Sequence, residues 1–306
     1  MGAFLHLGSY RVPLLLSALF LVLLPASATL IVTVVNGGRM YVATDSFCLG
    51  TGTMTNSLTE KVFKFNNSCL VGISGCYGGL WDDTKAGLTY QVDLVKGARQ
   101  LGMSVRTGTE ALETNIAKAV LVFGEAHSNF VALRRTSSTN GQKDFHTVLG
   151  FSGFDEASHP VMRNYEFNER TPPTLQETQY PIKTVKFQGE RQFPSALLSA
   201  VTETNFPATV LSNLTPDARR GAPALRDFLA GLASQDFKTI ANRVYAGAPV
   251  KEEQIVRFLL EIFQLHKENA ARLHFDGGYV DGPYVVFRIA DGRIIQIASL
   301  EGKTRK

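Results

Sequence analysis

Three residues near the amino terminus have types and spacing that suit acyl-transfer chemistry. Asp45 and Lys61 follow Thr29 by 16 and 32 residues. A threonine hydroxyl is a poor nucleophile until a base takes its proton. A threonine at a free chain end carries that base in its own α-amine, whose ordinary pKa is about 7.7 to 8.0. A nearby ammonium keeps the amine neutral and a carboxylate holds the ammonium in place, so we expect Thr29, Lys61 and Asp45 to act together.

A free Thr29 requires removal of the residues before it, and residues 1–28 have the pattern of a secretory signal peptide. Arg11 precedes an apolar run at 14–24, and the small residues 26–28 follow it. The run is shorter than the roughly 20 residues that a membrane-spanning helix needs. We expect cleavage after Ala28, a secreted or periplasmic protein and no stable membrane anchor. The alternatives are an uncleaved anchor and a cytoplasmic protein in which 1–28 is a propeptide.

Composition narrows the classes of partner. The 306 residues include 31 Lys and Arg against 27 Asp and Glu, a formal net charge of +4. This excess is small and evenly spread, so we expect no nucleic-acid partner. The three cysteines do not make a disulfide framework, and neither CxxC nor HExxH spacing occurs. We therefore expect no metal centre.

The elements that position these residues are expected to begin with two hairpins. Residues 29–46 form two β-rich runs joined by Asn36-Gly37-Gly38, a strong turn signal. In residues 61–73, apolar and polar side chains alternate up to a turn at Asn66-Asn67, and an apolar run follows the turn. Later strands are expected at 145–154, 161–167 and 182–187, and a closing hairpin at 283–300 with a turn at Asp291-Gly292.

Helices are expected between the strand regions. Leu80, Trp81, Leu88, Val92 and Val95 lie at roughly helical spacing and predict a helix. Other helices are expected at 112–123, 193–202 and 250–271, the last being the longest. Residues 205–249, rich in Pro, Gly and Ala, are interpreted as a partly helical insertion in a single domain that spans 29–306. The order of elements predicts helix layers around stacked sheets.

These motifs resemble the proteasome β subunits and their bacterial peptidase relatives, which belong to the N-terminal nucleophile hydrolases. Thr29 opening a strand, the ATDS box with Asp45, the TEKVFKF segment with Lys61 and the GISG box ending at Gly75 match that family in order and spacing. GFDE at 153–156 and VDGPYVVFRI at 280–289 extend a weaker likeness, so it covers nearly all of 29–300. The resemblance implies an α+β fold, a four-layer α-β-β-α sandwich of two antiparallel sheets.

The resemblance also implies a role for each residue. Thr29 would attack a peptide carbonyl with its α-amine as general base, Lys61 would tune the proton transfer, and Asp45 would position Lys61. The Gly75 amide would bind the oxyanion, a contact worth about 2.7 to 4 kcal/mol of barrier. A further aspartate of the family corresponds to Asp276, with Asp281 as an alternative. No metal or organic cofactor is implied.

Substrate and assembly follow from the same resemblance. Cys48 and Ile73 fall at specificity-pocket positions and imply a medium apolar side chain before the scissile bond of a peptide or protein substrate. A disulfide between Cys48 and Cys76 is left open, with Cys69 buried in its strand. The resemblance also implies homo-oligomers, and rings that enclose the active sites are one form that they could take.

Some positions depart from the family. Its SGS box falls on Gln188-Gly189-Glu190, which lacks the serine that assists the amine, and Val280 stands at a second serine position. The alternatives are therefore an amidase of the same superfamily acting on a small non-peptide amide, and a catalytically inactive scaffold or binding protein. Taken singly, Asp45 is interpretable as a turn residue, Lys61 as a solvated strand lysine and Gly75 as a tight-turn glycine.

Overall fold

The computed structural model describes thirteen stretches of the chain. They are residues 29–48, 57–58, 60–75, 78–83, 88–104, 110–137, 146–168, 174–176, 184–189, 192–202, 222–270, 280 and 283–300. The expected signal peptide, at 1–28, lies outside these stretches.

One five-stranded antiparallel sheet contains the start of the expected mature chain. Its strand order is β12-β1-β2-β13-β14. The strands are β1 (Leu30–Asn36), β2 (Arg39–Asp45), β12 (Val185–Gly189), β13 (Tyr284–Ala290) and β14 (Arg293–Leu300). Strand β1 thus lies between β2 and a strand more than 140 residues later in the sequence.

The second five-stranded antiparallel sheet has the order β11-β10-β9-β6-β5. Its strands are β5 (Val62–Lys64), β6 (Cys69–Gly75), β9 (Thr147–Phe154), β10 (Pro160–Phe167) and β11 (Thr174–Gln176). Two small antiparallel pairs complete the described strands, β3 (Phe47–Cys48) with β4 (Ser57–Leu58), and β7 (Gly78–Asp83) with β8 (Leu88–Asp93).

Six helices occur in the described residues. They are α2 (Leu94–Ser104), α3 (Leu112–Ser137), α4 (Gln192–Thr202), α7 (Ala222–Leu232), α8 (Gln235–Tyr245) and α9 (Glu252–Asn269). Helices α7 and α8 fall within the region interpreted as a partly helical insertion. The longest described helix is α3, with 26 residues against 18 in α9, so the prediction that the helix at 250–271 is the longest was wrong.

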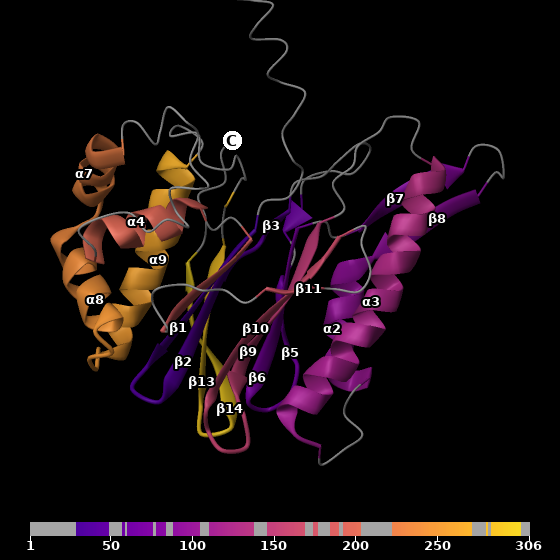
Figure 1. The fold of residues 1–306 in the computed structure, drawn as a ribbon, viewed down its shortest axis with the longest axis horizontal. Helices are drawn as coiled ribbons and strands as arrows, with labels where there is room; N and C mark the ends of the chain where they lie inside the picture. The colour runs from indigo at the N-terminus through magenta and orange to yellow at the C-terminus, as the bar shows by residue number, and fades with distance from the viewer. Residues whose placement is uncertain are drawn as a thin grey trace, which may run out of the picture.

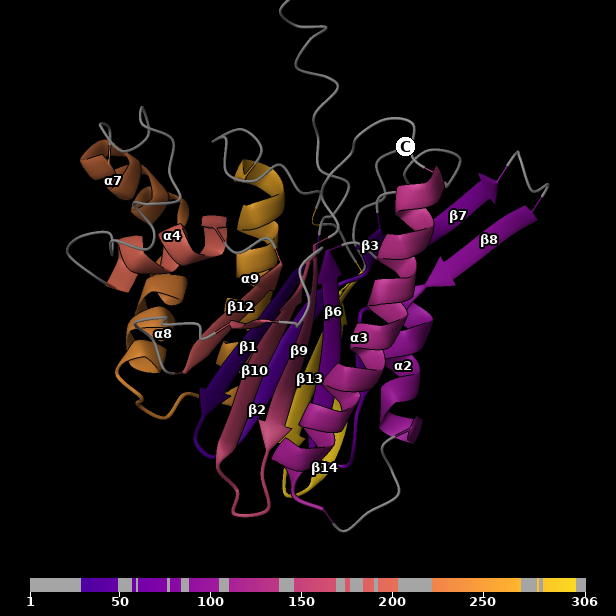
Figure 2. The same ribbon diagram turned by 45° about the vertical axis from the view of Figure 1, so that its right-hand side comes forward.

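The two sheets pack face to face with helices on both outer faces (Figure 1). One buried cluster joins the first sheet to α4, α7, α8 and α9, and a second joins the other sheet to α2 and α3. A third, smaller cluster, which includes Ile31, Met40 and Val42, lies between the sheets. The turned view in Figure 2 shows the same separation of the two helix groups. The arrangement is α+β and is compatible with a four-layer sandwich.

The two predicted hairpin turns of the first sheet are confirmed, and both lie at the same end of its strands. Gly37 and Gly38 both have positive φ, at 59° and 72°, in the turn between β1 and β2. Asp291 and Gly292 have φ of 51° and 65° between β13 and β14. Two successive positive φ angles are typical of type I′ hairpin turns, which match the twist of the strands that they join.

The helix predicted from Leu80 to Val95 was wrong up to Asp93, because Gly78–Asp83 and Leu88–Asp93 pair as strands β7 and β8. Only Val95 of the residues that predicted it lies in α2, which begins at Leu94. Two physical reasons appear in the sequence. Gly78 and Gly79 disfavour a helix, and residues 88–93, LTYQVD, are rich in residues that favour strands. The helix starts only after Asp93, whose carboxylate accepts a hydrogen bond from the Lys96 amide at 2.8 Å, as an N-cap does.

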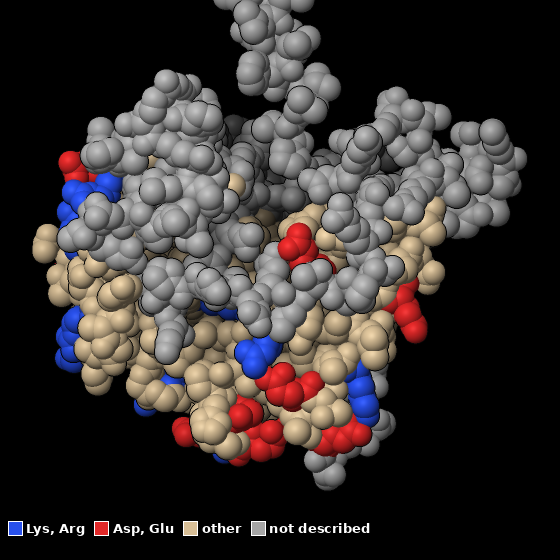
Figure 3. Space-filling view, viewed as in Figure 1, with Lys and Arg blue, Asp and Glu red and all other residues tan. Residues whose placement is uncertain are grey.

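The described surface carries both signs of charge. On the face drawn in Figure 3, Lys and Arg side chains lie among Asp and Glu side chains. Among the helices of the described stretches, none combines the length and apolarity needed to span a membrane.

Candidate active site

Thr29 immediately precedes β1 and is 1% exposed. Side chains alternate along a strand, and Ile31 packs in the cluster between the sheets while Leu30 packs in the cluster beneath the helices. This alternation puts Thr29 on the side of Ile31, toward the second sheet. Its buried Oγ1 has no hydrogen-bond partner within the described residues. Because Ala28 precedes it in the full-length chain, the Thr29 nitrogen there is an amide.

Asp45 and Lys61 form a buried ion pair at the start of β1. Lys61 Nζ lies 2.7 Å from Asp45 Oδ2, and both side chains are 0% exposed. The other carboxylate oxygen, Oδ1, accepts a hydrogen bond from the Leu30 amide at 2.9 Å. The carboxylate therefore ties the lysine to the residue that follows Thr29. Strand pairing brings this about, because β1 and β2 form a tight hairpin and Asp45 is the last residue of β2.

The electrostatics of the pair reflect its burial. Loss of solvent raises the pKa of the Asp45 carboxyl above its ordinary value, and the Lys61 ammonium and the Leu30 amide act in the opposite direction. A buried charge is costly unless it is paired and hydrogen-bonded, and Asp45 has both kinds of partner. The interpretation of Lys61 as a solvated strand lysine is wrong, because its side chain is fully buried.

Gly75 ends β6, opposite Thr147 of β9. Its φ is +92°, and a Cβ at this position would overlap the carbonyl oxygen of His146. The backbone therefore requires glycine here for geometric reasons, whatever its amide binds. The oxyanion role of Gly75 stays a prediction.

The remaining predicted site residues are only partly described. Ile73 is 0% exposed and packs in the cluster beneath α2 and α3, on the opposite face of β6 from Gly72 and Ser74. Cys48 lies in β3, but its side chain is outside the described part. Asp276 and its alternative Asp281 lie outside the described residues, as does Cys76. Cys69 is buried in β6, as expected, and is a free cysteine.

Two residues of β12 also contact the site region. Gly189 pairs with Leu30 and has φ +82°, and a Cβ there would overlap the carbonyl oxygen of Thr29. Gln188 is 6% exposed, and its Nε2 donates to the carbonyl oxygens of Gly72 and Val148, at 3.1 and 3.0 Å. Gln188 thus connects the two sheets. The sequence gives little sign that Gln188 is buried between the sheets, because apolar and polar residues alternate in VKFQG as they do in a strand with one solvated face.

Activation of the Thr29 hydroxyl by a free α-amine would require a cation and a carboxylate near the start of β1, and the arrangement contains both. It supplies a buried cation beside the start of β1 and a carboxylate that fixes it. Within the described stretches, His, Cys, Asp and Glu side chains do not gather in any group of three or more that would hold a metal ion.

The chain matches no protein-family model, and a search of curated proteins found no match either.

Proposed function

We propose that the protein is an exported, proteasome-type threonine peptidase that hydrolyses peptide bonds through Thr29 after removal of residues 1–28. The observation that carries the proposal is the fully buried Lys61–Asp45 pair, tied through Asp45 to the Leu30 amide. A stabilising role alone is a weak explanation for a fully buried ion pair, because apolar residues of similar volume often stabilise a fold equally well. The Lys61–Asp45 pair lies near Thr29, which directly follows a signal-peptidase cleavage pattern. This position favours a catalytic role for the pair.

The reaction would proceed through an acyl-enzyme. Thr29 Oγ attacks the peptide carbonyl carbon as its proton passes to the α-amine, and the carbonyl electron pair moves to the oxygen. When the tetrahedral intermediate collapses, the carbon–nitrogen bond breaks, and the α-ammonium gives its proton to the leaving amine. Water then attacks the ester, with its proton taken by the amine. The carbon–oxygen bond breaks, and the threonine hydroxyl recovers its proton.

Each charged residue has a defined part in this reaction. The Lys61 ammonium favours the neutral amine and the developing alkoxide by charge, without contributing a proton of its own. Asp45 is a positioning residue, since its two oxygens fix Lys61 and the Leu30 backbone. Gly75 would offer its amide to the oxyanion, in the role that the family resemblance assigns to it.

The fold supports the same assignment at a coarser level. Two antiparallel sheets between helix layers are compatible with the N-terminal nucleophile hydrolase sandwich. We include that fold in the proposal, together with homo-oligomers and possible rings.

A second candidate function is a non-catalytic scaffold. Gln188 stands where the family has its assisting serine, and its side-chain amide is engaged by two backbone carbonyls. Under this alternative, a Thr29→Ala protein would keep full biological activity.

The experiment compares the mature protein with two threonine variants. Peptide-library hydrolysis and adduct formation with a threonine-directed electrophile are measured for wild type, Thr29→Ala and Thr33→Ala. Thr33 is the matched control, because it is also buried in β1 but its Oγ1 lies 3.0 Å from the Ser152 hydroxyl. We expect Thr29→Ala to abolish both signals and Thr33→Ala to retain them. Cleavage of small amides without peptides would favour the amidase, and no reaction by wild type with a free Thr29 would favour the scaffold.

A further inference from the structure

Among the described residues, the Ser74 hydroxyl is buried and unpaired, close to the start of β1. Ser74 is the last residue but one of β6, is 0% exposed, and its Oγ has no hydrogen-bond partner within the described residues. A buried polar group left unpaired costs about 1–3 kcal/mol. Alanine would avoid that cost at this position, so the hydroxyl calls for another explanation.

The side chain of Ser74 faces the first sheet where β1 and β12 meet. A Cβ added to Gly72, on the same face of β6, would contact Ile31 of β1. A Cβ added to Gly189 would overlap the Thr29 carbonyl oxygen and lie 3.3 Å from Ser74 Cβ. Thr29, Gly189 and Ser74 therefore surround the same point.

Two hydroxyls in one small region are thus unpaired within the described stretches, since Thr29 Oγ1 is the other. The position at which the family resemblance puts an assisting serine is filled by Gln188. Its Nε2 donates to the carbonyls of Gly72 and Val148, so it supplies no hydroxyl to the amine. Cleavage after Ala28 would convert the Thr29 amide into an amine with additional N–H donors, which need an acceptor.

We propose that Ser74 is a positioning residue whose Oγ accepts a hydrogen bond from the freed α-amine of Thr29 and orients it toward the Thr29 hydroxyl. This inference rests on the proposed function. Ser74 takes over, from β6, the task that a serine at position 188 would perform from β12. Glycine at 189 is required for the arrangement, because any side chain there would fill the space between Thr29 and Ser74.

The test compares Ser74→Ala with Ser195→Ala in the mature protein. Ser195, in α4, is the control, because its Oγ is also without a partner within the described residues. Cleavage after Ala28 is first verified by intact mass, and thermal unfolding reports on the fold. We expect Ser74→Ala to lower kcat by about tenfold to a hundredfold with KM unchanged, as misorientation of a catalytic group does. Its melting temperature should be equal to or slightly below that of wild type, because the amine of the mature chain loses one acceptor.

The pH profile separates this role from a merely structural one. A hydroxyl that accepts from the amine favours the charged ammonium, because hydrogen bonds to charged donors are the stronger ones. Its removal lowers the pKa of the amine, so the acid limb of kcat/KM should move to lower pH in Ser74→Ala. Ser74→Cys, which is nearly isosteric but a weak acceptor, should show the same shift.

The outcomes distinguish the two proposals. A reactive wild type with Ser74→Ala and Ser74→Cys equal to it in kcat and pH profile would overturn the role of Ser74 and leave the peptidase proposal intact. A correctly cleaved wild type that neither hydrolyses peptides nor reacts with the electrophile would overturn both. Loss of kcat in Ser195→Ala as large as in Ser74→Ala would also overturn the specific role of Ser74.

Discussion

At the scale of single residues, the proposed chemistry depends on two opposite charges held out of water. Lys61 and Asp45 are both 0% exposed, and each has the other as its counter-ion. Each charge alone would be strongly destabilising, whereas an apolar pair of similar volume is often no less stable than the ions. Stability alone therefore does not explain why charged residues occupy these positions. The proposed function would explain them, because it needs an ammonium near Thr29.

Lys61→Met is expected to reduce both stability and activity. The Asp45 carboxylate would be left buried without its cation, at a cost of about 3–5 kcal/mol in the free energy of unfolding. Urea unfolding and peptide hydrolysis measure the two effects. The control is Lys118→Met, since Lys118 forms an exposed ion pair with Glu110 and should contribute less than about 1 kcal/mol.

The double variant Lys61→Met/Asp45→Leu separates the two effects. Removing both charges should recover most of the stability lost in the single variant, and the protein should stay inactive. A double variant with wild-type hydrolysis would contradict the role of the pair in catalysis.

At the scale of elements, β12 determines the geometry around Thr29. Gly189→Ala would place a Cβ against the Thr29 carbonyl oxygen. It would also force alanine to adopt a φ of +82°. Gly247→Ala is a matched control, since Gly247 has φ +67° but no atom within 4 Å of an added Cβ. Both variants should lose about 1–2 kcal/mol from the left-handed conformation. Only Gly189→Ala should also lose hydrolysis, by about a hundredfold through displacement of Thr29. Equal kcat in the two variants would contradict this.

Lys186, also in β12, predicts a pH-dependent stability. It is 5% exposed, and its Nζ has no hydrogen-bond partner within the described part of the chain. Burial, with a smaller contribution from Arg163, lowers its pKa from 10.5 to about 7. Between these pH values the unfolded chain binds more protons than the folded one. The free energy of unfolding should therefore rise with pH across this window, by up to about 1.4 kcal/mol per pH unit.

Lys186→Met should remove that rise and raise stability at and below pH 7. Urea unfolding between pH 6 and pH 10 measures the slope, with Lys96→Met, a change of an exposed lysine in α2, as the control. A wild-type slope equal to that of Lys186→Met would show that the buried amine does not titrate as expected.

Local sequence patterns predict the hairpins, but they do not predict which polar side chains are buried between the two sheets. The Asn36-Gly37-Gly38 turn fixes the register of β1 on β2, so the proximity of Asp45 to the start of β1 follows from the sequence. Gln188 and Lys186 are different, because they are polar residues in alternation with apolar ones, a pattern typical of a solvated strand face. Their burial results from a second sheet whose contacts lie 40 or more residues away. The β7–β8 hairpin was missed because its apolar spacing suits a helix as well.

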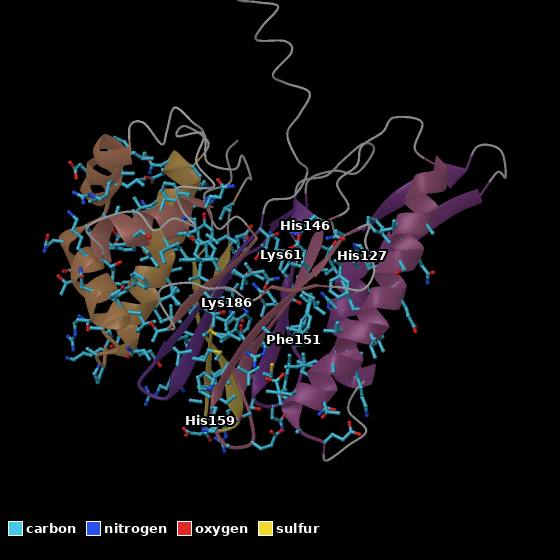
Figure 4. All side chains as sticks on the ribbon, in the orientation of Figure 1. Lys61, His127, His146, Phe151, His159 and Lys186 are labelled. Carbon is cyan, nitrogen blue, oxygen red and sulfur yellow. The ribbon has the colours of Figure 1, made fainter. Side chains whose placement is uncertain are left out.

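At the scale of the whole molecule, the two sheets hold the site near one end of the strands. In Figure 4, Lys61 lies toward one end, whereas His159, in the turn between β9 and β10, lies toward the other. The β1–β2 and β5–β6 hairpins belong to different sheets, so the Lys61–Asp45 pair spans the two sheets. Partial unfolding that separates the sheets should therefore disrupt the site.

Assembly is the next property at this scale. We expect the mature protein to form homo-oligomers, as its resemblance to ring-forming peptidases implies. Native mass spectrometry across micromolar concentrations measures this directly. A monomer at every concentration would exclude rings and would leave the single-chain chemistry to be judged by the residue variants.

The proposed peptidase requires that Thr29 begin the mature chain. Amino-terminal sequencing of the protein from its native host, with intact mass, tests this requirement most directly. We expect the sequence Thr29-Leu30-Ile31 and a mass that corresponds to loss of residues 1–28. A mature chain that starts at any other residue, or that retains residues 1–28, would leave no free α-amine on Thr29 and would contradict the proposed mechanism.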